Sequence, residues 1–191
     1  MFERFTKDAR AVVEGAVGYS ERAGAEAVDE EHMLLALLDR EGSRGSFALA
    51  SLGAVGRRDS VERALAETRR RAGLSRAETE ALSGLGIDVS EIVSRVEETH
   101  GAGALEAGRR GGSGGRSGRR PFTRGAKETL TQSLRLALAR QDRHIGDEHL
   151  LMALTVRPGV PAEVLADHGV TFESVTRVLY GDGDGEAKAA G

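Results

Sequence analysis

Cysteine and tryptophan are both missing from this chain of 191 residues, and only 4% of its residues are aromatic. Without cysteine, the protein cannot form disulfides, bind zinc through thiolates or use a thiol as a nucleophile. Because aromatic side chains are few, the core must be built mainly from leucine, valine, isoleucine and alanine. The length suits one domain or two small ones, either of which can bury a hydrophobic core.

Long hydrophobic runs are missing as well. No apolar stretch approaches the roughly 18 residues of a membrane span, so no membrane partner is expected. The first residues, Met1 to Phe5, include charges and lack the apolar run of a signal peptide. The net charge of −3 argues against a general nucleic-acid binder. Since the lack of cysteine also fits a reducing compartment, we expect a cytoplasmic protein.

What the chain does contain is an internal repeat. The stretch Glu30-Glu31-His32-Met33-Leu34-Leu35-Ala36-Leu37 occurs again as Asp147-Glu148-His149-Leu150-Leu151-Met152-Ala153-Leu154. Each copy follows a Phe-Thr pair at the same distance, Phe5-Thr6 in the first half and Phe122-Thr123 in the second. Two correspondences at one offset indicate a tandem duplication.

Both halves show helical patterns and no strand signals. Thr6 and Thr123 are expected N-caps, and each precedes apolar residues at helical spacing. Second helices are expected at about 29–40 and 147–156, and the fourth helix of the first half at about 88–100. The predicted fold is therefore all-α, with two tandem four-helix repeats in a pseudo-two-fold arrangement and a helical insertion in the first repeat.

The predicted boundaries follow from the repeat and from composition: a first repeat at 1–100 with its insertion at about 54–85, a linker at 101–120, a second repeat at 121–180 and a disordered tail at 181–191. Glycine, serine and arginine dominate the linker, which is typical of a solvated tether. The alternative is a basic arm for nucleic acid, formed by Arg109, Arg110, Arg116, Arg119 and Arg120. No aromatic residue interleaves these arginines, so base stacking is not supported and nucleic-acid binding is disfavoured.

The repeated motifs resemble those of the Clp N-terminal (Clp repeat) domain family. Phe-Thr-x-x-Ala-(Arg/Lys) opens each repeat of that family, and here it is Phe5 to Arg10 and Phe122 to Lys127. Ile-Gly-x-Glu-His-(Ile/Leu)-Leu-x-(Ala/Gly)-Leu marks its second helix, and here it is Ile145 to Leu154 and, more loosely, Val28 to Leu37. The resemblance covers most of the chain apart from the insertion, the linker and the tail.

This resemblance implies a docking platform that belongs to Clp-type AAA+ unfoldases and binds adaptors and substrate proteins or peptides. The sequence departs from those unfoldases because it contains no Gly-x-x-x-x-Gly-Lys-(Ser/Thr) motif for ATP phosphates. We therefore expect a free-standing, ClpC-like N-domain protein that is not an enzyme and uses no cofactor. It would deliver its ligands to a Clp unfoldase or sequester them from it.

The resemblance also implies ligand-binding residues. The glutamates that match Glu31 and Glu148 take part in binding phosphorylated arginine in ClpC-type relatives. A carboxylate can accept two parallel hydrogen bonds from a guanidinium, and a helix N-terminus favours a phosphate. Thr6 and Thr123 would complete such sites if the fold brought them close to the glutamates. The alternative is that both glutamates only stabilise helix starts or pair with a neighbouring arginine.

Further candidates are aromatic and basic. In ClpC-type domains an apolar groove binds peptides and cyclic-peptide antibiotics, and the resemblance places Phe2, Phe5, Phe122 and Lys127 at such a groove. For Phe5 and Phe122 the favoured alternative is a role as core anchors, because large aromatic side chains are mostly buried.

Histidines are the remaining candidates. His32 and His149 beside acidic residues raise a metal hypothesis, but no dense ligand set such as His-Glu-x-x-His is present, so helix scaffolding is favoured over metal binding. No catalytic motif such as Gly-x-Ser-x-Gly occurs, which leaves no catalytic residue to predict.

Overall fold

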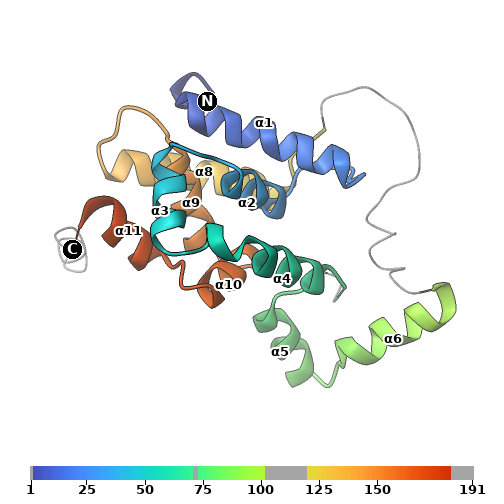
Figure 1. Cartoon of the computed structure of the whole chain (residues 1–191). Helices are drawn as coiled ribbons and strands as arrows, with labels where there is room; N and C mark the ends of the chain where they lie inside the picture. Colours follow the sequence, from blue (N-terminus) through green and yellow to red (C-terminus); the bar gives the residue numbers. More distant parts are fainter. Residues whose placement is uncertain (1, 71–72, 102–119, 182–191) are drawn as a thin grey trace.

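The computed structural model describes residues 2–70, 73–101 and 120–181, except for the side chains of residues 2 and 70. This part of the chain is helical (Figure 1), with two isolated backbone bridges and no strand. Its elements are η1 (Phe2–Arg4), α1 (Lys7–Arg22), α2 (Glu30–Leu38), α3 (Arg44–Ser51), η2 (Val55–Arg57), α4 (Arg58–Arg70), α5 (Arg76–Gly84), α6 (Val89–His100), α8 (Arg124–Ala139), α9 (Asp147–Val156), α10 (Val160–Asp167) and α11 (Phe172–Tyr180). The all-α prediction is confirmed.

Local sequence signals explain where the helices begin. The Thr6 hydroxyl accepts a hydrogen bond from the Ala9 backbone N–H, and the Thr123 hydroxyl accepts one from Ala126, each at 3.1 Å. Both threonines therefore satisfy one of the N–H groups that a helix start leaves without an intrahelical partner. The two N-caps predicted from sequence are thus confirmed, and Asp88 caps α6 in the same way.

The two repeats are arranged as a pseudo-two-fold pair. Within each repeat the first two helices pack together, α1 on α2 and α8 on α9. The third helix of each repeat packs against a later helix of the other repeat: α3 packs against α11, and α10 packs against α4. At the centre, α9 contacts α8, α3, α10, α1, α11 and α2, and its residues from Asp147 to Leu154 are all buried. The core is therefore shared between the repeats rather than divided into two.

These contacts between the repeats place the fourth helix of the first repeat at α4. The contact of α4 with α10 is the counterpart of the contact of α11 with α3. The sequence pattern had suggested 88–100 as the fourth helix, but α6 at that position makes its main contact with α5. We therefore infer that the added segment of the first repeat begins after α4, rather than at residue 54.

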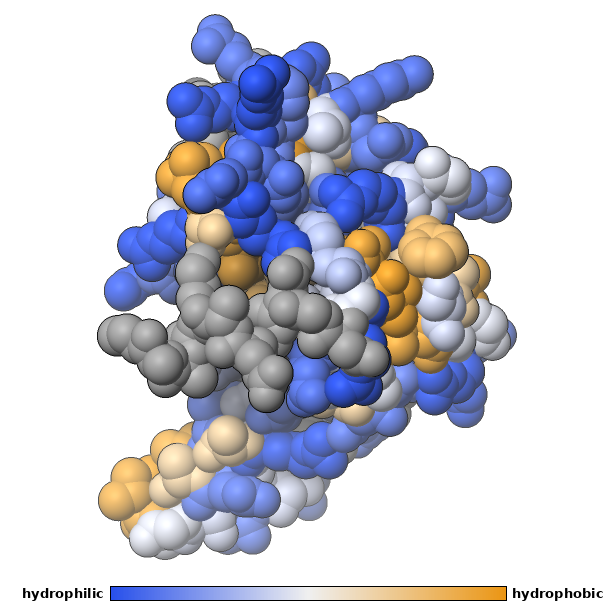
Figure 2. Space-filling view, turned by 90° about the vertical axis from the view of Figure 1, so that its left-hand side faces the viewer, coloured by the Kyte–Doolittle hydropathy of each residue, from blue (hydrophilic) through white to orange (hydrophobic). Residues whose placement is uncertain are grey.

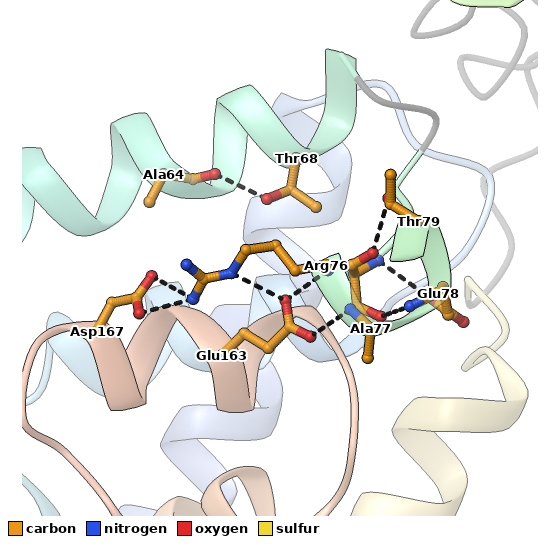
Figure 3. Close-up of polar contacts among 9 residues, drawn as sticks. Ala64, Thr68, Arg76, Ala77, Glu78, Thr79, Glu163 and Asp167 are labelled. Atoms are coloured by element: carbon orange, nitrogen blue, oxygen red, sulfur yellow. Dashed lines mark hydrogen bonds and ion pairs between the residues drawn. The ribbon is translucent and has the colours of Figure 1, made fainter. Parts of the chain in front are cut away.

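Polar contacts hold the added segment to the second repeat (Figure 3). The Arg76 guanidinium donates two hydrogen bonds to Asp167, at 2.7 and 2.8 Å, and Glu163 accepts the backbone N–H groups of Arg76 and Ala77 at 2.7 and 3.3 Å. Glu163 thus sits at the N-terminus of α5, where the helix dipole favours a negative charge. In Figure 1, α5 lies below α4 and α10, and α6 extends away from the other helices.

The surface is largely hydrophilic, and Figure 2 shows separate hydrophobic areas on one face. Eight large apolar side chains are exposed among the described residues: Phe47, Val55, Leu85, Ile87, Ile92, Leu138, Val156 and Phe172. Three of them, Leu85, Ile87 and Ile92, belong to the added segment, which therefore exposes apolar side chains instead of only covering the core. No helix in the described ranges combines the length and the apolar character that crossing a membrane requires.

Candidate functional site

The structure brings the start of the first helix of each repeat beside the start of the second helix of the other repeat. Thr6 donates its backbone N–H to the Ile145 carbonyl at 2.9 Å, just before α9 begins. In the equivalent place, Thr123 donates to the Val28 carbonyl at 2.9 Å, just before α2 begins. Bridges between Phe5 and Ile145 and between Val28 and Phe122 complete these contacts. The two Phe-Thr motifs therefore face the two Glu-His motifs in crossed pairs.

Glu148 lies at the N-terminus of α9 and is nearly buried. Its side chain is 7% exposed, and its carboxylate lies against Gly146, where a Cβ atom would come within 1.9 Å of Glu148 Oε2. Arg44, at the first position of α3, donates a hydrogen bond to Glu148 Oε1 at 3.0 Å. Burial raises the pKa of Glu148, although its own backbone N–H and the charge of Arg44 oppose that shift. The carboxylate is thus engaged by an arginine of the first repeat.

Glu31 occupies the equivalent position on α2 and also meets an arginine. Its side chain is 14% exposed, and Oε2 forms an ion pair with Arg69 Nε on α4 at 3.1 Å. The threonine expected beside Glu31 contacts the preceding residue instead, because the Thr123 hydroxyl donates to Glu30 Oε2 at 3.3 Å. The structure therefore brings Thr123 to the start of α2 but joins it to Glu30 rather than to Glu31.

Asp147, the residue before Glu148, connects the repeats. It is 2% exposed, and its Oδ2 atom accepts hydrogen bonds from the Ser43 hydroxyl and from the Gly45 backbone N–H, the latter at 3.1 Å. The carboxylate thereby accepts a hydrogen bond from an N–H group that α3 leaves without an intrahelical partner. Its negative charge also interacts favourably with the positive end of the α3 dipole. No local sequence pattern indicates this role, because only the folded chain brings a residue of the second repeat to α3.

Both motif histidines act as helix caps. His32 Nδ1 accepts the Asp29 backbone N–H at 3.1 Å, and His149 Nδ1 accepts that of Gly146 at 3.0 Å. Because Nδ1 of His149 is an acceptor, the proton lies on Nε2, which donates to Asp142 at 3.0 Å. No group of three or more potential metal ligands occurs among the residues that the structure describes.

The pH dependence of stability should report on this cap. Burial lowers the pKa of His149 from its ordinary value of 6.5, and the bond to Asp142 only partly opposes that shift. As the pH falls below 6.5, the unfolded chain takes up the proton before the folded chain does, so stability is expected to fall toward the lowered pKa. Because burial raises the pKa of Glu148, this carboxyl contributes the opposite slope, between its ordinary pKa of 4.5 and the raised value.

Urea denaturation of the wild type and of His149→Gln between pH 7.5 and 5 checks this expectation, since glutamine can also cap a helix from this position. His149→Gln should flatten the decline below pH 6.5. An unchanged decline in His149→Gln would assign the effect to another group.

Tyr180, at the last position of α11, is a neighbour of Glu148 that sequence reasoning also missed. The Arg140 guanidinium lies 3.3 Å from the centre of its ring, and that of Arg44 lies 5.0 Å away. Burial raises the pKa of Tyr180. Aromatic faces attract cations, so the ring provides a second contact for Arg44 besides Glu148.

An apolar groove lies beside Phe122. Its volume is about 540 Å³, and its walls are Arg10, Val13, Glu14, Val17, Arg120, Pro121 and Phe122. Of the predicted groove residues whose side chains are described, Phe122 lines this groove, whereas Phe5 and Lys127 do not. Phe5 is 1% exposed and belongs to the core, as the alternative interpretation held. Lys127 is exposed on α8, and the side chain of Phe2 lies outside the described part.

Most of the basic residues of the linker lie outside the described part of the chain. Arg109, Arg110, Arg116 and Arg119 lie outside the described residues, as does the tail beyond Gly181, and only Arg120 is described, at the wall of the groove.

Comparison with known proteins defines the class of this fold. The family model of the Clp repeat (R) N-terminal domain matches residues 4–81 and 121–188, so each repeat is matched in its own right. The chain belongs to the Clp N-terminal domain family, which is a family of non-catalytic substrate-binding domains.

Solved structures agree with that assignment at the level of the fold. The N-terminal domain of the caseinolytic protease-associated chaperone ClpD from Arabidopsis thaliana is 18% identical, with 94% of both chains covered and a TM-score of 0.53. The Hsp104 N-terminal domain from Candida albicans is 14% identical, with 92% of this chain and 88% of that chain covered and a TM-score of 0.51. A protein from a study of a malarial protein secretion system is 15% identical, with 92% of both chains covered and a TM-score of 0.55.

Proposed function

We propose that this protein binds phosphoarginine-marked proteins and peptides at two sites, one around Glu148 and one around Glu31. The observation that carries the proposal is the crossed pairing of helix starts, through Thr6 with Ile145 and through Thr123 with Val28. Each pairing places two helix N-termini and a carboxylate in one region. A phosphorylated arginine carries a guanidinium and a phosphate side by side, which this combination of groups suits.

The two parts of the ligand would have different partners. The carboxylates of Glu31 and Glu148 would accept N–H groups of the guanidinium, as Glu148 Oε1 accepts one hydrogen bond from Arg44 Nη1 in this structure. The phosphate would lie toward the starts of α1 and α9 in one site and of α8 and α2 in the other, near Thr6 and Thr123. The positive end of each helix dipole favours an anion there.

The groove beside Phe122 would hold peptide side chains that neighbour the marked arginine, or apolar cyclic peptides. Its volume of about 540 Å³ falls in the range of small-ligand pockets. Val13, Val17 and Phe122 supply apolar walls, while Arg10 and Glu14 supply polar ones. Lys127 would contact ligands from the exposed side of α8. Such a groove would add affinity that does not depend on phosphorylation.

The proposed role of the protein is that of an adaptor in the Clp protease system of the cytoplasm. Domains of this family interact with Clp-type unfoldases and with substrates. A chain with two ligand sites would either deliver marked proteins to an unfoldase or withhold them from it. Delivery and sequestration require the same binding step, so binding is what an experiment must test first.

The double variant Glu31→Gln/Glu148→Gln is expected to lose phosphoarginine affinity by about 10–100-fold or more. A charge-assisted hydrogen bond contributes about 1.5–3 kcal/mol, and each site would lose its charged acceptor. Isothermal titration calorimetry with free phosphoarginine measures the loss. Glutamine keeps the volume that the Glu148 side chain fills against Gly146, so the variant should remain folded.

The control is a double variant with the same change of charge at exposed positions, Glu91→Gln/Glu173→Gln, whose side chains are 61% and 83% exposed. It should bind phosphoarginine as the wild type does. Equal affinity in a folded Glu31→Gln/Glu148→Gln protein would refute the proposal.

A further inference from the structure

Each proposed ligand carboxylate is already engaged by a guanidinium of the chain itself. Arg44 Nη1 lies 3.0 Å from Glu148 Oε1, and Arg69 Nε lies 3.1 Å from Glu31 Oε2. Both glutamates are largely covered, with 7% and 14% of their side chains exposed. A guanidinium on a ligand could reach either carboxylate only after the internal arginine has moved.

These two ion pairs did not arise together from the duplication. Glu31 and Glu148 are equivalent positions of the repeat, but Arg44 and Arg69 both belong to the first repeat. Arg44 begins α3, and α10, the counterpart of α3, begins with Val160. Two arginines at non-equivalent positions therefore pair with glutamates at equivalent positions. Each ion pair thus belongs to its own site and was not copied by the duplication.

Each arginine side chain has an alternative position that it can adopt when it is displaced from its glutamate. Arg44 is half exposed, and its guanidinium lies 5.0 Å from the centre of the Tyr180 ring, where it can stay stacked without Glu148. Arg69 lines an open cavity of about 650 Å³ and its side chain is 38% exposed, so its guanidinium can turn into solvent. Release of either arginine therefore requires a side-chain rotation rather than a change of fold.

We propose that Arg44 and Arg69 are internal occupants of the two ligand sites, so that binding is an exchange of one guanidinium for another. This inference rests on the proposed function. An unmodified arginine on a protein surface would gain little by the exchange, because it replaces an equivalent contact. A phosphorylated arginine would gain in addition the contacts of its phosphate. The internal arginines thus lower the affinity for every guanidinium ligand, and only a phosphorylated arginine compensates through the contacts of its phosphate.

Removal of the occupants tests this directly. Arg44→Gln and Arg69→Gln, combined in one chain, should bind both phosphoarginine and free arginine about tenfold more tightly than the wild type, which corresponds to about 1.4 kcal/mol. Titration calorimetry at pH 8 with each compound measures the change, and the alkaline pH favours ionised Glu148. Arg95→Gln removes a 77% exposed arginine that pairs with Glu91 on α6, and it should leave both affinities unchanged.

The outcomes separate this inference from the function on which it rests. If wild type and Arg44→Gln/Arg69→Gln bind phosphoarginine equally well, the exchange is wrong and the proposed function stands. If the double variant binds phosphoarginine more weakly, the arginines contact the ligand and the exchange is also wrong. If no variant binds phosphoarginine, both proposals fail.

Discussion

Replacing Leu151 by alanine is expected to lower the free energy of unfolding by about 2–5 kcal/mol. Leu151 is fully buried on α9, the helix that contacts both repeats. The substitution removes apolar surface from the shared core and leaves a cavity that six surrounding helices cannot easily fill. Because one core serves both repeats, the loss should appear as a single unfolding transition at lower urea concentration.

Leu138→Ala is the matched control for that experiment. Leu138 lies on the neighbouring helix α8 but is 54% exposed, so its truncation should cost less than about 0.5 kcal/mol. Urea denaturation followed by circular dichroism measures both variants. Two separate transitions in Leu151→Ala would mean that the repeats have independent cores, in disagreement with the packing of α9.

Gly45→Ala is expected to destabilise the protein by about 2–4 kcal/mol. An added Cβ atom would come within 2.5 Å of Asp147 Oδ2 and 3.3 Å of the Asp147 backbone carbonyl carbon. Asp147 is 2% exposed and has a short side chain, so it cannot move away without losing its bonds to Ser43 and Gly45. A buried carboxylate would then lack its donors at the contact between the repeats.

Gly125→Ala is the matched comparison, because the side chain that an added Cβ atom would meet there can move. Its Cβ atom would come within 1.9 Å of Glu30 Oε1, but the Glu30 side chain is longer and 27% exposed, so it can rotate into solvent. Gly125 is the second residue of α8, where alanine loses less backbone entropy than glycine, and this gain offsets the loss of the Glu30 contacts with Thr123 and Arg157, so stability should change little. Thermal unfolding of both variants distinguishes them. Equal losses would show that Asp147 is no more fixed than Glu30.

The sequence predicted the helical repeats well because their signals are local. The apolar spacing of residues and the caps Thr6 and Thr123 act within one turn of a helix, and duplication showed every signal twice. Placement of the fourth helix was harder. The segment of α6 has an apolar pattern suited to that role, but only the contact between α4 and α10 reveals which helix completes the repeat.

The candidate sites were predictable as motifs and not as contacts. Glu31 and Glu148 follow from the repeat, whereas their partners Arg69 and Arg44 come from distant helices. Thr123 contacts Glu30 and not the predicted Glu31, so the contact predicted from the motif was wrong by one residue. Neighbouring residues of a helix point about 100° apart, since 3.6 residues make one turn, and only the packing of α2 decides which one faces α8.

The central claim is that duplication produced two ligand sites, each carrying one of the repeated glutamates. The number of phosphoarginine molecules bound per chain tests this claim most directly, by titration calorimetry of the single variants Glu31→Gln and Glu148→Gln. We predict two molecules per wild-type chain and one per chain in either single variant. One molecule per wild-type chain, or two in both single variants, would contradict the account.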